Sequence, residues 1–228
     1  MPKTDSNVSR IYAALRRMAA DFELKPDERI NESALSQTLG ASRTPLREAL
    51  NRLVAEGFLT FQSGRGFFCR PLSPAAVMEL YEARVAVETE TARLAARNAT
   101  DEGRRALSGL LDEMAEEYAA SEDAARLLEM DEAFHLEIAA LSGNGELCRM
   151  VENLNDRVRF IRMVFMSRMA ASGAPRLAAH RAIAEAINRG DEAAAAQAMR
   201  SHIERRRGEA AEAVRTAYSR IYVPEDGS

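Results

Sequence analysis

The chain has 228 residues, of which 46% are hydrophobic and 29% are charged, and its net charge is −4. This length suits one large or two modest globular domains, and the hydrophobic fraction is sufficient for sizeable cores. No run approaches the roughly 20 apolar residues that span a bilayer, and the first residues lack an apolar secretory signal, so we expect a soluble, cytoplasmic protein with no membrane partner.

Charge differs between the two parts of the chain. Residues 1–70 contain 11 Lys and Arg against 8 Asp and Glu, a net charge of +3, whereas residues 71–228 contain 20 against 27, a net charge of −7. A contact with nucleic acid is therefore expected in the N-terminal segment. Cys69 and Cys148 have no CxxC neighbour and fall in different segments, so we expect two free thiols.

Three short helices are predicted in the N-terminal segment. Apolar residues at helical spacing indicate a first helix over residues 6–22. Asn31 is a good N-cap for a short second helix, which stops at Gly40 because glycine readily adopts the left-handed conformation of a tight turn. Ser42 is the expected N-cap of a third helix, with Pro45 in its first turn.

The third helix leaves polar side chains outside its buried stripe, namely Arg43, Thr44, Arg47, Asn51 and Arg52. A helix, a tight turn and a second helix with exposed arginines near its start form a helix-turn-helix, and arginine can bond guanine bidentately or grip a phosphate. Residues 58–69 then indicate two short strands around a glycine-rich tip, which is a wing. The alternative, a merely solvated helix face, explains neither the turn nor the wing.

Residues from about Ile11 to Arg70 resemble the winged helix of the GntR family. The resemblance rests on Leu35, Gly40, the run from Ser42 to Leu50, Leu53, Glu56-Gly57 and Gly64-Arg65-Gly66. It implies that Arg43, Thr44, Arg47 and Gly64 touch DNA. We expect the whole DNA-contacting set to be Ser42, Arg43, Thr44, Arg47, Asn51, Gly64 and Arg65. Ser33, flanked by Glu32, stands where some members have a basic residue, so no phosphate contact is carried over there.

A proline-rich boundary follows Arg70, and beyond it the chain is rich in Ala, Glu and Arg with no strand pattern. Six helices are predicted, near 74–98, 101–118, 122–141, 144–170, 174–189 and 191–220. Short connections indicate antiparallel neighbours in a bundle. The expected fold is therefore mainly α. It comprises a winged helix-turn-helix over residues 1–72, an all-α antiparallel bundle for effector binding and dimerisation over 73–222, and a disordered tail over 223–228.

The three histidines of the chain, His135, His180 and His202, each fall on the inward face of a separate predicted helix. Asp131 lies one turn before His135, so both can bind the same ion. A single buried histidine is more often a hydrogen-bonded core residue, which stays the alternative for each one. Because a bundle brings the helices together, we expect one divalent metal ion, with zinc first and nickel, manganese or iron as alternatives.

Most of residues 75–205 resembles the FCD effector-binding domain of the FadR subfamily. The matching motifs are Leu80 to Arg84 with Glu88, Asp131 to His135, Ser142-Gly143-Asn144, His180 to Ile183 with Ala186-Ile187, Gly190-Asp191 and His202. In metal-binding members, the residues that match Asp131, His135, His180 and His202 hold a divalent cation, to which an organic acid can coordinate. The resemblance thus implies a small organic acid as effector.

Three further residues are candidates for effector binding. Arg84 lies on an apolar stripe, where it can pair with a ligand carboxylate or, equally, form a buried salt bridge with Glu88 or another helix. Asn155 and Arg162 lie beside the apolar stripe of their own helix and are candidates of the same kind.

Together these patterns predict a ligand-responsive, sequence-specific transcriptional regulator, with repression as the expected sign. A two-fold homodimer on a palindromic DNA operator is expected, because one recognition helix reads few base pairs. Two alternatives stay open: a winged-helix regulator with purely structural histidines, and a metal-dependent enzyme with a DNA-binding appendage. The sequence has no HExxH, no paired ExxH and no recognisable nucleophile–base pair, so we do not expect an enzyme.

Overall fold

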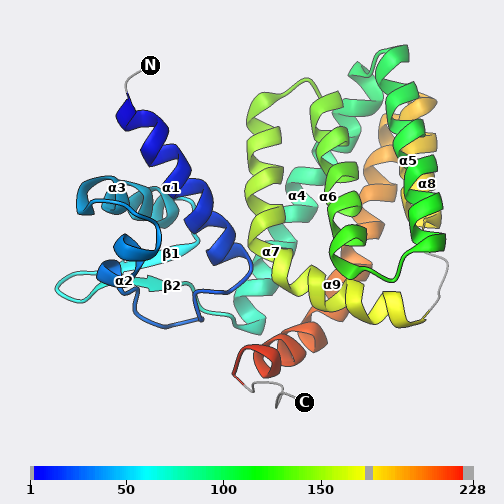
Figure 1. The fold of residues 1–228 in the computed structure, drawn as a ribbon. Coiled ribbons are helices and arrows are strands. Elements are labelled where there is room, and N and C mark those ends of the chain that lie inside the picture. The colour runs from blue at the N-terminus through cyan, green and yellow to red at the C-terminus, as the bar shows by residue number, and fades with distance from the viewer. Residues whose placement is uncertain (1–2, 173–176, 223–228) are drawn as a thin grey trace. The chain divides into compact units, whose positions relative to one another are not determined.

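The computed structural model describes residues 3–172 and 177–222 and confirms the predicted mainly α fold, a winged helix followed by a helical domain (Figure 1). The chain forms two compact units, and the second spans Pro74–Ala217. The second unit begins one residue after the predicted bound of 73 and ends five residues before the predicted bound of 222. The tail over 223–228, predicted to be disordered, lies outside the described residues.

The first unit begins with the helices α1 (Lys3–Ala20), α2 (Glu32–Thr38) and α3 (Arg43–Ala55). Asn31 caps α2, because its side chain accepts a hydrogen bond from the backbone N–H of Ala34 at 3.0 Å. The tight turn between α2 and α3 contains Gly40 with a φ of +57°.

Ser42 occupies the N-cap position of α3, as predicted, but its side chain makes no capping hydrogen bond. An N-cap hydroxyl usually accepts from the second or third helical N–H. The third helical residue of α3 is Pro45, which has no N–H to donate. Ser42 is therefore the N-cap by position, as predicted; Pro45 removes one of the two usual donors, and the other, the N–H of Thr44, does not bond to the Ser42 side chain in this structure.

The wing consists of strands β1 (Leu59–Gln62) and β2 (Gly66–Cys69), which pair antiparallel. Arg29, in the loop before α2, forms a backbone bridge with Phe68 on the other edge of β2. The loop backbone is therefore fixed beside the wing. The core beneath these elements consists of fully buried apolar residues, among them Ile11, Leu15, Leu46, Leu50, Leu53, Phe58 and Phe67.

The second unit is a bundle of helices joined by short connections, as predicted. Its helices are α4 (Pro74–Asn98), α5 (Asp101–Ala120), α6 (Ala124–Leu141), α7 (Gly145–Ser172), α8 (Ala178–Asn188) and α9 (Glu192–Tyr222), of which the residues up to Ala217 belong to this unit. Helix α6 packs against α4, α5 and α7, and α8 packs against α4 and α5 (Figure 1). The predicted start of α8 at residue 174 lies outside the described residues, and the helix is described from Ala178. The inward faces of α6, α8 and α9 are the ones that bear the histidines.

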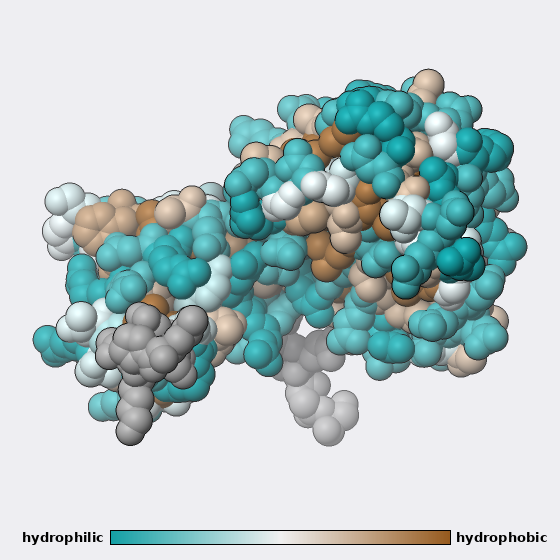
Figure 2. Space-filling model, turned by 90° about the horizontal axis from the view of Figure 1, so that it is seen from above, coloured by the Kyte–Doolittle hydropathy of each residue, from teal (hydrophilic) through white to brown (hydrophobic). Residues whose placement is uncertain are grey.

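Hydrophilic side chains cover most of the face shown in Figure 2, and apolar side chains reach this surface in smaller patches. Among the described residues, Phe61 and Met150 are the large apolar side chains that are about half exposed. None of the described helices is both long enough and apolar enough to cross a membrane. Both cysteines are free thiols, with Cys69 buried and Cys148 partly exposed.

Candidate metal centre and DNA-binding surface

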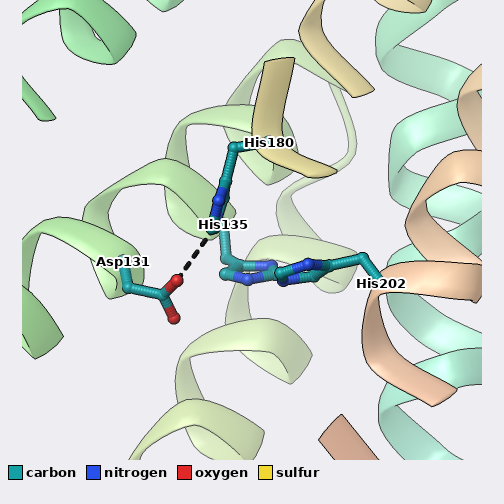
Figure 3. Close-up of side chains that lie close together, drawn as sticks. All are labelled: Asp131, His135, His180 and His202. Atoms are coloured by element: carbon teal, nitrogen blue, oxygen red, sulfur yellow. Dashed lines mark hydrogen bonds and ion pairs between the residues drawn. The ribbon is translucent and has the colours of Figure 1, made fainter. Parts of the chain in front are cut away.

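Four side chains of metal-ligand type converge inside the bundle (Figure 3). Helix α6 presents Asp131 and His135 one turn apart, α8 presents His180, and α9 presents His202. One possible ligand atom from each residue lies within 4.8 Å of the others. All four residues are at most 5% exposed. The sequence therefore predicted correctly that these side chains face one another.

The imidazole rings lie close together, but some of their nitrogens have no hydrogen-bond partner. The ring centroid of His202 lies 4.7 Å from that of His180 and 5.3 Å from that of His135. His180 Nε2 lies 2.9 Å from Asp131 Oδ1 (Figure 3). In contrast, His135 Nε2 and His180 Nδ1 are buried without a hydrogen-bond partner. Buried polar atoms without a partner are uncommon and need an explanation.

Two chains of polar contacts link the cluster to charged and polar residues outside it. In the first, Arg84 Nε donates to Glu88 Oε1 at 2.6 Å. Glu88 Oε2 lies 2.5 Å from His135 Nδ1, although the two atoms are not aligned for a straight hydrogen bond. In the second chain, Arg162 forms an ion pair with Asp131 Oδ2. Arg162 also donates to Asn155 Oδ1 at 2.9 Å. Both carboxylates that touch the cluster are thus paired with an arginine.

Burial and these partners set the charges at the site. Burial alone would raise the pKa of Asp131, but Arg162 and His180 outweigh it and hold that pKa well below its usual value. Burial likewise opposes ionisation of Glu88, and Arg84 and His135 lower its pKa nevertheless. Burial lowers the pKa of His135, and burial together with the neighbouring His180 lowers that of His202. At neutral pH, Asp131 is therefore an anion, while His135 and His202 are neutral bases.

A cavity of about 20 Å³ borders the cluster, which is room for one ion or one water molecule. Arg84 and Arg162 line it, whereas Asn155 does not and reaches it only through Arg162. Sequence reasoning missed Tyr81, Phe165 and Arg206 in the cavity wall. Their spacing was a usable signal, because Tyr81 precedes Arg84 by three residues and Arg206 follows His202 by four, which places each pair on one helix face.

The predicted DNA-contacting residues lie on an exposed surface of the first unit. Ser42, Arg43, Thr44, Arg47 and Asn51 are all exposed on or just before α3, and Gly64 and Arg65 are exposed at the tip of the wing. Gly64 has a φ of +73°, a conformation that favours glycine.

A groove at this surface is lined by Arg29, Ile30, Asn31, Glu32, Ser33, Arg43 and Arg47. Arg29 was not predicted, because nothing in the sequence indicates that its loop pairs with the wing. The recognition helix, the wing and this basic groove together have the features of a DNA-binding surface.

A winged helix joined to a helical domain with a buried polar cluster defines the class of DNA-binding transcriptional regulators with an effector domain. Residues 7–69 match the family model described as bacterial regulatory proteins, gntR family, and residues 79–205 match that of the FCD domain. The chain belongs to the gntR family and contains an FCD domain.

Known proteins agree with this membership. The chain is 38% identical over 211 residues to the Nta operon transcriptional regulator of Aminobacter aminovorans, covering 92% of this chain and 98% of that protein. It is 28% identical to the HTH-type transcriptional repressor GlaR of Escherichia coli (strain K12), over 84% of this chain and 90% of that one. The structure of E. coli McbR/YncC has the same fold, with a TM-score of 0.72 at 21% identity, and the match covers 93% of this chain and 99% of that one.

Proposed function

We propose that this protein is a ligand-responsive, sequence-specific transcriptional regulator whose bundle binds one divalent metal ion together with a small organic acid. The observation that supports the metal most strongly is the pair of buried ring nitrogens, His135 Nε2 and His180 Nδ1, that have no hydrogen-bond partner. Such atoms cost free energy in an ion-free site, and a metal ion would use the lone pairs of deprotonated ring nitrogens.

The residues present fit a metal ion. Three imidazoles and one carboxylate are the donor types that zinc prefers, and nickel, manganese and iron also accept them. Asp131, His135, His180 and His202 would hold the ion. Glu88 would orient His135 through its Nδ1, so that Nε2 faces the centre of the cluster, and Arg162 would orient Asp131 in the same way. When bound, the ion would supply a positive charge to which an acid oxygen can coordinate.

Charge balance favours an acidic effector. Arg84 is paired with Glu88 and Arg162 with Asp131, so a divalent ion would add two uncompensated positive charges to a buried site. A carboxylate could reduce that charge, and the cavity wall offers Tyr81 and Arg206 for contacts. Because the cavity holds only about 20 Å³, its side chains must move to admit an organic ligand. That movement is how the effector would influence the rest of the protein.

The DNA-binding half of the proposal rests on α3 and the wing. Arg43 and Arg47 would contact bases or phosphates from the recognition helix, with Ser42, Thr44 and Asn51 as further polar contacts. Gly64 and Arg65 would reach the backbone or the minor groove from the wing. The protein would act as a homodimer on a palindromic operator, because two recognition helices read twice as many base pairs. Repression is the proposed sign, in keeping with the name of GlaR as a repressor.

Metal analysis of protein purified without an affinity tag or chelator tests the proposal. Wild type should contain close to one divalent ion per chain and His180→Ala much less. Arg181→Ala, an exposed substitution on the same helix, should retain the ion. Small carboxylic acids should then raise the melting temperature of wild type but not of His180→Ala. Equal metal content in wild type and His180→Ala would instead support purely structural histidines.

A further inference from the structure

One carboxylate lies within the otherwise basic groove beside the recognition helix. Glu32 is the first residue of α2, and its two carboxylate oxygens lie 3.2 Å and 3.0 Å from one nitrogen of Arg47, NH1. Both side chains are accessible, with Arg47 49% and Glu32 27% exposed. The pair therefore lies at the surface that we assign to DNA, and not in the core.

The geometry leaves half of the guanidinium free of this contact. Both bonds to Glu32 come from NH1, so the edge formed by Nε and NH2 is not engaged by this carboxylate. A guanidinium edge with two N–H groups is what guanine O6 and N7 accept. The Phe67 ring, centred 5.3 Å from the guanidinium carbon, packs against the same side chain. Arg47 thus has an acidic partner on one side and an aromatic neighbour within contact of its guanidinium.

We infer that Glu32 is a specificity-determining residue, which holds Arg47 for base recognition and keeps its guanidinium away from phosphates. A phosphate that approaches Arg47 either displaces the Glu32 carboxylate or lies beside it, and two negative charges side by side repel each other. Contacts with phosphates supply most of the affinity for arbitrary DNA, whereas contacts with base edges distinguish sequences. Glu32 should therefore weaken binding to unrelated DNA more than binding to the correct site.

The direct test is Glu32→Gln, which removes the charge with little change in shape. We would measure binding of the full-length protein to a 24-base-pair duplex of arbitrary sequence by fluorescence anisotropy across a salt series. If Arg47 gains one phosphate contact, affinity should rise about eightfold at 0.1 M salt and the slope of log K against log salt should steepen by about 0.9. Preference for a site that wild type selects from a random DNA library should fall correspondingly.

Two comparisons make the result specific. Glu23→Gln changes net charge equally at an exposed position outside the groove, so it should leave affinity nearly unchanged. In an Arg47→Ala background, Glu32→Gln should no longer raise the affinity, because the arginine that it releases is absent. The inference is overturned if Glu32→Gln matches Glu23→Gln, or if its gain persists without Arg47.

Discussion

Replacing Glu88 by glutamine tests whether this residue organises the buried cluster. The carboxylate contacts Arg84 at 2.6 Å through one oxygen and His135 at 2.5 Å through the other, and both Glu88 and Arg84 are at most 3% exposed. Breaking a buried ion pair by removing one charge lowers the free energy of unfolding by about 3–5 kcal/mol. Because the amide oxygen of glutamine can still accept a hydrogen bond from Arg84, we expect Glu88→Gln to lose about 3 kcal/mol, near the lower end of this range. Loss of the carboxylate that orients a histidine ligand should also weaken metal binding about 10- to 100-fold.

These two effects are separable by a second substitution. In Glu88→Gln/Arg84→Met no buried charge lacks a partner, so most of the lost stability should return while metal binding stays weak. The free energy of unfolding would be measured in urea with a chelator, and metal affinity by competition with a chromophoric chelator. Glu90→Gln, which alters a partly exposed pair with Arg93 on the same helix, is the matched control. A Glu88→Gln protein that equals this control in both assays would refute the reasoning.

Three further predictions follow from burial and backbone geometry. Folding lowers the pKa of His135 and of His202, so below about pH 6.5 the unfolded chain takes up protons that the folded chain does not. The free energy of unfolding of the metal-free protein, measured by urea titration, should therefore fall by at most about 1.4 kcal/mol per histidine between pH 7.5 and 5.5. An unchanged urea midpoint would contradict this. Burial raises the pKa of Cys69 to about 12, so a thiol reagent should label Cys148 in the native protein and Cys69 only after unfolding; labelling of both at equal rates would disprove it. In Gly109→Ala, on α5, the new Cβ meets no neighbour, so the free energy of unfolding should rise by up to about 1 kcal/mol. In Gly103→Ala the new Cβ would lie 2.5 Å from Leu141, so this variant should gain less stability or lose some. Thermal melts that rank the two variants the other way would exclude this reasoning.

The sequence was sufficient for the helices and for the convergence of the cluster. Apolar residues at helical spacing, interrupted by Gly, Pro and Asn, located the ends of the bundle helices to within two residues wherever the predicted end lies among the described residues. The inward faces followed from the same spacing, so His135, His180 and His202 were expected to meet before the packing of the helices was known. These properties are local, or depend only on which face of a helix is buried.

Contacts between residues far apart in the sequence could not be predicted in the same way. Arg84 and Glu88 are one turn apart, so their pairing was foreseeable as one of two outcomes, but the approach of Glu88 to His135 depends on how α4 packs on α6. Arg162 on α7 pairs with Asp131 on α6, and the spacing of residues within either helix does not indicate this pairing.

The missing side-chain bond of Ser42 could be foreseen only in part, because Pro45 removes one of the two N–H groups from which an N-cap side chain usually accepts.

The chain has no imidazole outside the cluster, since its three histidines all lie there. Any method that responds only to imidazole thus reports on this site without residue-selective labelling or subtraction of other histidine signals. In a nitrogen NMR spectrum of the side chains, every histidine signal would describe the tautomer or metal ligation of a residue in the cluster. Such spectra, recorded while metal or a carboxylic acid is added, would follow the FCD domain directly, even while the winged helix is bound to DNA.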